Sequence, residues 1–224
     1  LDKIDFVAML RAIEPAIDRT LPGRALPALQ RLVVLGPERP AATVAFTAIC
    51  AATAPDVDAA VRPEDVVIMQ YTSGTTSFPK GVLLTHDNVL RNAANVGQRI
   101  GVRAGDRYFS ARPFYHVAGT TLSLLVALSA GACLLTTPSF DAGTSLQIME
   151  AERCTLVSGN DTIFLMMMSH PDFATRRLPL RGSWAAAGPV VMRQVIERMS
   201  IAEICFAYGL SEASPNVVMS DHRD

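Results

Sequence analysis

Apolar residues recur along this chain of 224 residues in short blocks with either helical or strand-like spacing. Val89, Ala93, Val96 and Ile100 follow at i, i+4, i+7 and i+11, which predicts a helix with one buried face. Thr85 precedes this run and is a typical N-cap. Further helices are expected at 4–17, 43–51, 144–152 and 190–199, and strands at 32–35, 66–70, 108–111, 155–158 and 204–208.

The longest uncharged stretch runs from Val117 to Thr137. Its 21 residues meet the length of a membrane span. Thr and Ser interrupt the stretch, and Gly131 divides it into a helix-like part at 122–128 and a strand-like part at 133–136. A buried helix, turn and strand explains this pattern better than a transmembrane segment.

Composition narrows the class of protein. Half of the residues are apolar and 18% are charged, which predicts a packed core. The net charge of -1 argues against a nucleic-acid-binding surface. The four scattered cysteines form neither a zinc pattern nor a disulfide framework, which favours reduced thiols and a cytoplasmic location. No signal peptide opens the chain, which lacks an initiator Met and ends in a charged tail, so we expect a piece of a longer protein.

The stretch from Tyr71 to Gly81 reads Y-T-S-G-T-T-S-F-P-K-G and gathers hydroxyls, glycines and one lysine. Glycine lets the backbone direct N–H groups at an anion, and Lys80 adds a positive charge, so this composition suits a phosphate loop. A plain surface turn is the alternative. A Walker loop is excluded, because Pro79 and Gly81 flank Lys80 where that motif has Gly and Ser or Thr.

Three other stretches carry candidate chemistry. His116 lies among aromatic residues after the strand expected at 108–111, where a structural histidine is the common interpretation. The small residues of 182–189 suit either close packing or a flat ligand lying on backbone. Glu212 follows a strand end, where a carboxylate can bind Mg²⁺ jointly with phosphate, although a solvated surface charge is the usual fate of glutamate. The methionines at 166–168 are typical of core filling.

These stretches, in this order, resemble the motifs of the adenylate-forming superfamily, which includes acyl-CoA synthetases, amino-acid-activating adenylation domains and luciferases. The loop at 71–81 resembles Y-T-S-G-T-T-G-x-P-K-G and departs from it at Ser77. The other matches are P-x-F-H-x-x-G at 113–119, with Tyr115 in place of Phe, and Y-G-x-T/S-E at 208–212. The turn at Ala187, Gly188 and Pro189 resembles the family's G-G-A-P adenine-binding turn, with Ala and Gly exchanged. A second departure is Asp161, where the family's G-V-P-T segment has proline.

The resemblance implies a fold and a site. The fold is α/β, with the layered α/β/α sheets of the large N-terminal domain, here incomplete. Catalytic roles fall on Lys80, His116 and Glu212, and Glu212 is the metal ligand. The nucleotide-binding residues would be Thr72, Ser73, Gly74, Thr75, Thr76, Ser77, Lys80, Ala187, Gly188, Pro189, Tyr208, Gly209, Leu210, Ser211 and Glu212. His116 would lie near the acyl carboxylate, and the helix at 163–168 would border the acyl pocket.

The implied activity is that of an acyl-CoA synthetase. A carboxylic acid attacks the α-phosphate of ATP with Mg²⁺ to give an acyl-adenylate and pyrophosphate, and coenzyme A then forms a thioester. Residues 1–224 would be the central part of the AMP-binding domain, with the small C-terminal domain absent. Two alternatives remain open at this point: an amino-acid-activating domain, for which Asp161 is a thin candidate to hold the ammonium group, and an inactive fragment that only binds.

Overall fold

A computed structural model describes residues 4–36, 39–52, 60–72 and 78–223 of the chain. The chain divides into two units, Leu1–Ala60 and Val61–Asp224. The second unit contains every residue assigned to the candidate site.

The first unit consists of short elements. Helix α1 (Phe6–Ile13) is followed by the 3₁₀ turn η1 (Pro15–Asp18), and strands β1 (Val33–Val34) and β2 (Val44–Ala45) pair in parallel before helix α2 (Phe46–Cys50). The helix expected at 4–17 is therefore shorter than predicted. Pro15 has no N–H for a helical hydrogen bond and instead opens η1, where the Glu14 side chain caps the turn.

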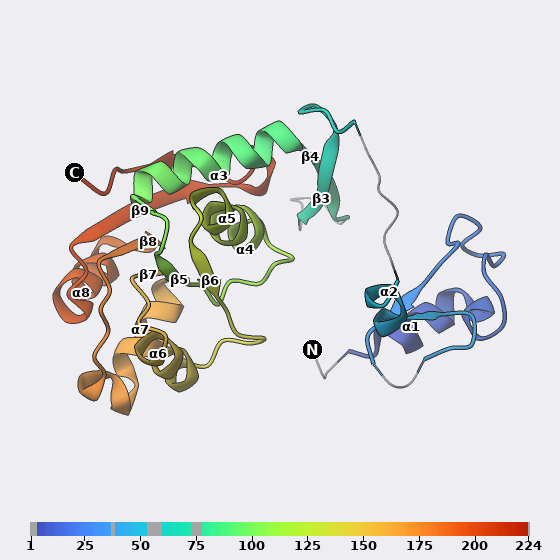
Figure 1. Ribbon diagram of the computed structural model, residues 1–224, viewed down its shortest axis with the longest axis horizontal. Helices are drawn as coiled ribbons and strands as arrows, with labels where there is room; N and C mark the ends of the chain where they lie inside the picture. Colours follow the sequence, from blue (N-terminus) through green and yellow to red (C-terminus); the bar gives the residue numbers. More distant parts are fainter. Residues whose placement is uncertain (1–3, 37–38, 53–59, 73–77, 224) are drawn as a thin grey trace. The chain divides into compact units, whose positions relative to one another are not determined.

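The second unit is built on a sheet of six strands in the order β10-β9-β8-β7-β5-β6. Its strands are β5 (Arg107–Phe109), β6 (Cys133–Leu135), β7 (Leu156–Asn160), β8 (Gly182–Ala186), β9 (Glu203–Gly209) and β10 (Asn216–Met219). All neighbouring strands pair in parallel except β10, which runs antiparallel to β9. The carboxyl ends of five strands consequently lie along one edge (Figure 1).

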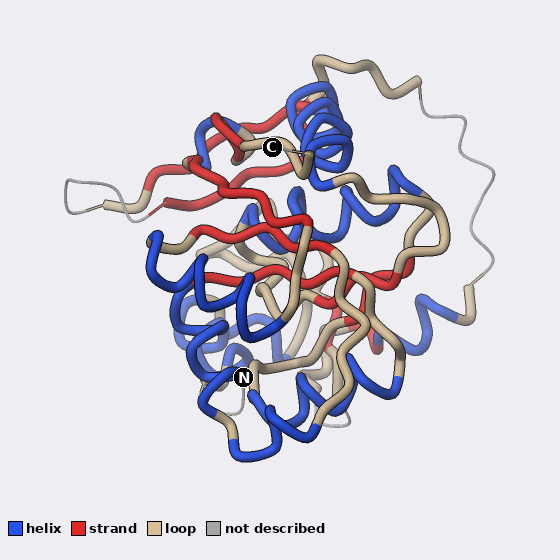
Figure 2. The backbone as a smooth tube through the Cα atoms, turned by 90° about the vertical axis from the view of Figure 1, so that its left-hand side faces the viewer, coloured by secondary structure: helices blue, strands red, loops and turns tan. Residues whose placement is uncertain are grey.

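Helices cover both faces of this sheet (Figure 2). One face packs against α3 (His86–Ile100), the π-helical turn η2 (Thr120–Leu125) and α5 (Val126–Ala130), with the short α4 (Val117–Gly119) before η2. The other face packs against α6 (Ala142–Ala151), α7 (Asp161–Ser169) and α8 (Pro189–Met199). Two 3₁₀ turns, η3 (Pro171–Thr175) and η4 (Ser211–Ala213), complete the unit. The predicted α/β/α layering is confirmed.

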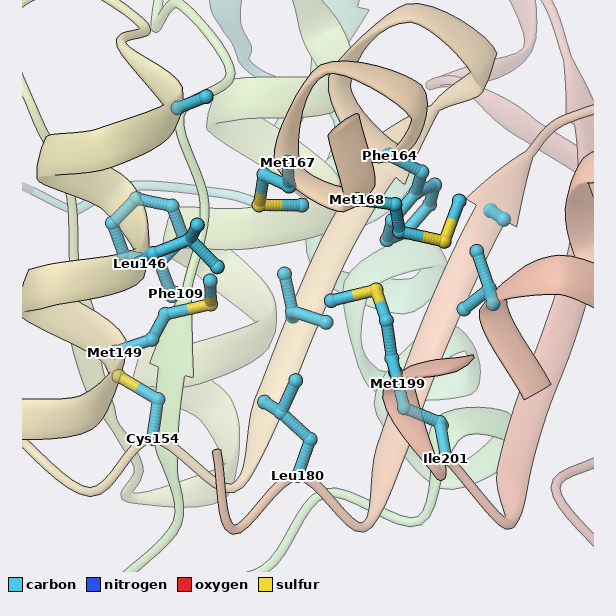
Figure 3. Close-up of a cluster of buried hydrophobic side chains, with 14 of the residues drawn as sticks. Phe109, Leu146, Met149, Cys154, Phe164, Met167, Met168, Leu180, Met199 and Ile201 are labelled. Carbon is cyan, nitrogen blue, oxygen red and sulfur yellow. The ribbon is translucent and has the colours of Figure 1, made fainter. Parts of the chain in front are cut away.

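The core under α6, α7 and α8 is rich in methionine (Figure 3). Met167 and Met168 are buried there beside Phe164, Met149 and Met199. Methionine fills irregular gaps because its side chain is unbranched and flexible. These two residues therefore fill the core as expected, and they do not line the cavity described below. Met166, the third of the run, is instead 48% exposed.

The helix expected after Thr85 is confirmed in detail. Thr85 accepts a hydrogen bond from the Asn88 N–H at 3.2 Å, and the Asn88 side chain accepts one from the Thr85 N–H, which forms a capping box. The four residues of its apolar stripe, Val89 to Ile100, are all buried. In the uncharged stretch, helix, turn and strand follow in the predicted order, and no described helix is long and apolar enough to cross a membrane.

Strands β2 and β10 were not predicted, and neither was a strand that directly follows the predicted phosphate loop. Residues Lys80–Thr85 form β4, which pairs antiparallel with β3 (Val66–Thr72). Lys80 is thus the first residue of a strand rather than part of a loop, and it lies opposite Thr72. The hairpin packs on the rest of the unit through Leu84, which is buried with Val89 and Val117.

Candidate functional site

The predicted site segments follow the carboxyl ends of β5, β7, β8 and β9. The segment with His116 follows β5, Asp161 follows β7, and the turns at 187–189 and 210–212 follow β8 and β9. The connections after β5 and β7 leave in opposite directions, toward β6 and toward β8, which makes these neighbouring strands a topological switch point. In open α/β sheets, ligands bind in the crevice at such points.

A cavity of about 180 Å³ opens at this edge. Its lining comes from three strand ends and from the start of the helical stretch after His116: Arg112, His116, Val117, Ala118, Leu122, Trp184, Ala186, Ala207, Gly209, Leu210, Ser211, Pro215 and Asn216. The cavity therefore brings together predicted site residues that lie almost 100 positions apart in the sequence.

His116 caps the helical turn that follows it. The Ala118 N–H donates to His116 Nδ1 at 3.1 Å, so the neutral ring carries its proton on Nε2. Partial burial lowers the pKa of His116, and the positive charge of Arg112 lowers it further. The ring is therefore uncharged at neutral pH.

The spacing of the 113–119 motif has a steric reason. The His116 N–H donates to Pro113 O, and the Gly119 N–H donates to His116 O at 2.8 Å, which folds the segment tightly. A Cβ atom on Gly119 would lie 2.2 Å from Pro113 O. The segment is joined to the hairpin by Gln70, whose Nε2 donates to Tyr115 O at 2.8 Å.

The turn at 187–189 is held by Asp161. Its Oδ1 accepts a hydrogen bond from the Gly188 N–H at 2.9 Å, and Pro189 then opens α8 at a position where its missing N–H costs nothing. This bond gives the departure at Asp161 a structural explanation, because a proline could not accept it.

The segment after β9 presents the predicted aromatic and acidic side chains. Tyr208 is 60% exposed, and the Leu210 N–H donates to Pro215 O at 2.8 Å, which closes the loop that holds η4. Glu212 is exposed, and it forms no ion pair with any described residue. No group of three or more His, Cys, Asp or Glu residues gathers within the described part of the chain. Glu212 fits a Mg²⁺ ion shared with phosphate oxygens better than a site built from protein alone.

The predicted phosphate loop is described only at its ends. Ser73, Gly74, Thr75, Thr76 and Ser77 lie outside the described residues. Thr72 ends β3, and Lys80 begins β4 with an exposed side chain that pairs with no described carboxylate. Lys80 does not line the cavity, but its strand contacts η4, the turn of Ser211 and Glu212.

Sequence reasoning missed most of the cavity lining, including Arg112 and Trp184, and it also missed Gln70. Arg112 lines the cavity and Gln70 bonds to the His116 segment. Arg112 could have been noticed as a charged residue directly before the Pro113 motif, and Gln70 as a polar amide at the end of the apolar run at 66–70.

Comparison with known proteins identifies related chains. The family model described as "AMP-binding enzyme" matches residues 7–224. A protein of Bacillus subtilis (strain 168) that carries an acyl-CoA synthetase name, YngI, is 36% identical, over 96% of this chain and 42% of its own length. A mitochondrial medium-chain acyl-CoA ligase of Danio rerio is 31% identical, over 92% of this chain and 37% of its own length. This chain thus spans less than half the length of these relatives.

Solved structures show the same fold. The N-terminal domain of FACL13 from Mycobacterium tuberculosis superposes with a TM-score of 0.73 at 23% identity, covering 94% of this chain and 51% of that chain. The anthranilate CoA ligase AuaEII, solved with anthranoyl-AMP, superposes with a TM-score of 0.76 at 23% identity, covering 87% of this chain and 39% of that chain.

Proposed function

Because this chain belongs to the AMP-binding enzyme family, we propose that it carries the nucleotide and acid sites of an AMP-forming acid–CoA ligase. Such an enzyme uses ATP and Mg²⁺ to convert a carboxylic acid to an acyl-adenylate, releases pyrophosphate, and passes the acyl group to coenzyme A. The relatives are named as an acyl-CoA synthetase and an acyl-CoA ligase, which supports a carboxylic acid as the substrate and coenzyme A as the thiol. Residues 1–224 would form the central part of the adenylation domain of a longer, cytoplasmic protein.

One observation carries the proposal. His116 after β5 and the segment Gly209–Ser211 after β9 line a single cavity at the carboxyl edge of the sheet. This is the part of an α/β sheet where ligands bind, and the cavity brings together the hydroxyl-bearing residue Ser211 and an uncharged imidazole. Such an arrangement can hold a phosphate on one side and an acid on the other.

Each proposed role follows from chemistry and position. Lys80 and the loop at 72–77 would hold the β- and γ-phosphates, and at an effective dielectric near 20 two charges about 4 Å apart attract by roughly 4 kcal/mol. Ser211 would contact the α-phosphate, and Glu212 would hold the Mg²⁺ that neutralises charge there. Tyr208 and the turn Ala187–Pro189 would bind adenine. Catalysis would then rest on positioning and charge neutralisation.

The cavity favours a plain acid over an amino acid. Arg112 lines it without a described carboxylate partner, and a guanidinium disfavours a substrate ammonium group nearby. Asp161, the thin candidate for an ammonium partner, already accepts the Gly188 N–H.

Acid-dependent exchange between ATP and pyrophosphate tests the proposal. The full-length protein and this chain would each be assayed with panels of aliphatic, aromatic and amino acids. Exchange that depends on an aliphatic or aromatic acid, followed by thioester formation with coenzyme A, is the expected result. Exchange with amino acids alone would identify the amino-acid-activating alternative, and no exchange in the full-length protein would leave only a binding module.

We expect adenylation to depend on the uncharged form of His116. Since the pKa of His116 lies below its ordinary value near 6.5, the rate should be flat from about pH 7 to 8 and fall at lower pH. His116→Gln should lower the rate and remove this acid limb. Pre-steady-state rates of adenylate formation at each pH would test this, and an acid limb that persists in His116→Gln would assign it to another group.

We also predict a measurable role for Asp161. Asp161→Ala removes the acceptor for the Gly188 N–H and should raise the KM for ATP by about two- to tenfold, because a solvent-exposed hydrogen bond contributes modestly. Asp161→Asn keeps an acceptor oxygen and serves as the matched control. Equal KM values for wild type and Asp161→Ala would show that the turn holds without this bond.

A further inference from the structure

The Arg112 side chain enters the cavity without a partner for its charge. Its Cζ lies 5.2 Å from the centroid of the Trp184 ring, over the face of the indole. Its Nε and Nη2 are buried and donate to no acceptor in the described structure, and no described carboxylate pairs with it. Stacking on the Trp face stabilises the guanidinium in part, but it does not compensate for buried N–H donors that lack an acceptor.

Hydrogen bonds hold the Trp184 ring on which this guanidinium stacks. The Trp184 Nε1–H donates to Tyr108 Oη, and Tyr108 Oη donates to Leu122 O at 3.1 Å. Both rings are almost completely buried. The surface on which Arg112 lies is therefore rigid, and burial lowers the pKa of the Arg112 guanidinium. A cation held in this way is prepared to receive a negative group from a ligand.

The guanidinium of Arg112 lies over Trp184 in the lining of the cavity. Trp184 lies inside β8, two residues before its end at Ala186, whereas the proposed nucleotide turn at 187–189 and the segment 208–212 lie beyond the strand ends. Three residues of strand from Trp184 to Ala187 span about 10 Å. Allowing about 3 Å for a hydrogen bond leaves about 7 Å between a carboxylate activated at the strand ends and an acceptor bound by Arg112.

The cavity is also small. Its volume of about 180 Å³ falls below the range of roughly 300–1,000 Å³ that is common for ligand sites. The lining includes the apolar residues Val117, Leu122 and Ala207 together with the guanidinium of Arg112. This lining suits a short aliphatic chain that ends in an acceptor.

We propose that Arg112 is a specificity-determining residue that selects short dicarboxylic acids of about four to six carbons. One carboxylate would react with ATP at the strand ends, and the guanidinium of Arg112 would bind the other. This inference deepens the proposed function and rests on it. The substrate would then be supplied by reactions that produce short dicarboxylic acids, and the product would be the monothioester of such an acid with coenzyme A.

The test compares matched acids in the full-length protein. The kcat/KM of acyl-CoA formation would be measured with succinic, glutaric and adipic acids and with butyric, valeric and hexanoic acids of the same lengths. Wild type should prefer at least one diacid over its matched monoacid by tenfold or more. Arg112→Met, which keeps the apolar stem, should lower kcat/KM for that diacid at least tenfold more than for its matched monoacid, while Arg112→Lys should retain part of the preference.

Controls separate the possible failures. Arg91→Met removes an equal charge from an exposed site on α3, where Arg91 pairs with Asp87, and should change no preference. A wild-type preference for monoacids, or an equal loss for both acid types in Arg112→Met, would overturn the role of Arg112 and leave the ligase function intact. If wild type activated no acid of any kind, the proposed function would fail, and this inference with it. The wild-type comparison decides the matter even if Arg112→Met does not fold.

Discussion

Replacing Lys80 with alanine should lower adenylate formation by at least tenfold, which corresponds to about 1.4 kcal/mol of activation free energy. Lys80 begins β4 opposite Thr72, and its ammonium pairs with no described carboxylate. Because no described carboxylate neutralises the Lys80 ammonium, its full charge can attract phosphates bound at the adjoining hydroxyl-rich sequence. The loss should appear mainly in the rate constant for adenylate formation, because charge on the phosphates increases as the leaving pyrophosphate separates.

The sequence offers a convenient control for this experiment. The chain contains two lysines, Lys3 and Lys80, so Lys3→Ala removes the same charge elsewhere. Amine labelling followed by peptide mass mapping should show that MgATP protects Lys80 and leaves Lys3 reactive. Unchanged turnover in Lys80→Ala, or equal labelling of Lys80 with and without MgATP, would contradict the phosphate-loop assignment.

Local patterns were enough to predict most of the second unit. The stripe from Val89 to Ile100 and the cap at Thr85 fixed the position of α3, and Pro189 marked the first turn of α8. The strand ending at Gly209 was evident from its apolar run. In each case one short segment holds the whole signal, because helix caps and strand ends are set by neighbouring residues.

Features that depend on contacts between segments far apart in the sequence could not be predicted from local patterns. Strand β4 is defined by its partner β3, and its sequence from Lys80 to Thr85 also suits a loop. Arg112 could be noticed as a charge near a motif, but only the packing of β8 beside β7 and β9 places Trp184 beneath it. The bond from Gly188 to Asp161 likewise joins two strand ends that the sequence separates by 27 positions.

Gly209→Ala should abolish adenylation almost completely, with a loss of at least a hundredfold. Gly209 pairs with Asn216 where β9 meets β10, and a Cβ there would lie 1.9 Å from Pro215 O and 2.8 Å from the Pro215 carbonyl carbon. Both atoms belong to the backbone, so no side-chain rotation relieves the clash, and the two strands must separate. The loop between them carries Ser211 and Glu212, so the proposed phosphate and magnesium ligands would move with it.

A second glycine provides the matched control. Gly97 lies buried in α3, and a Cβ there would meet only Val126 Cγ1, at an ordinary contact distance of 3.7 Å. Gly97→Ala should keep full activity and stabilise the helix by about 0.5–1 kcal/mol, because alanine loses less backbone entropy on folding. Thermal unfolding and ATP–pyrophosphate exchange would be measured for both variants. Wild-type exchange in Gly209→Ala would mean that the turn after β9 tolerates displacement, and the roles proposed for Ser211 and Glu212 would then have to be abandoned, because ligands of a phosphate and its metal cannot shift without loss of rate.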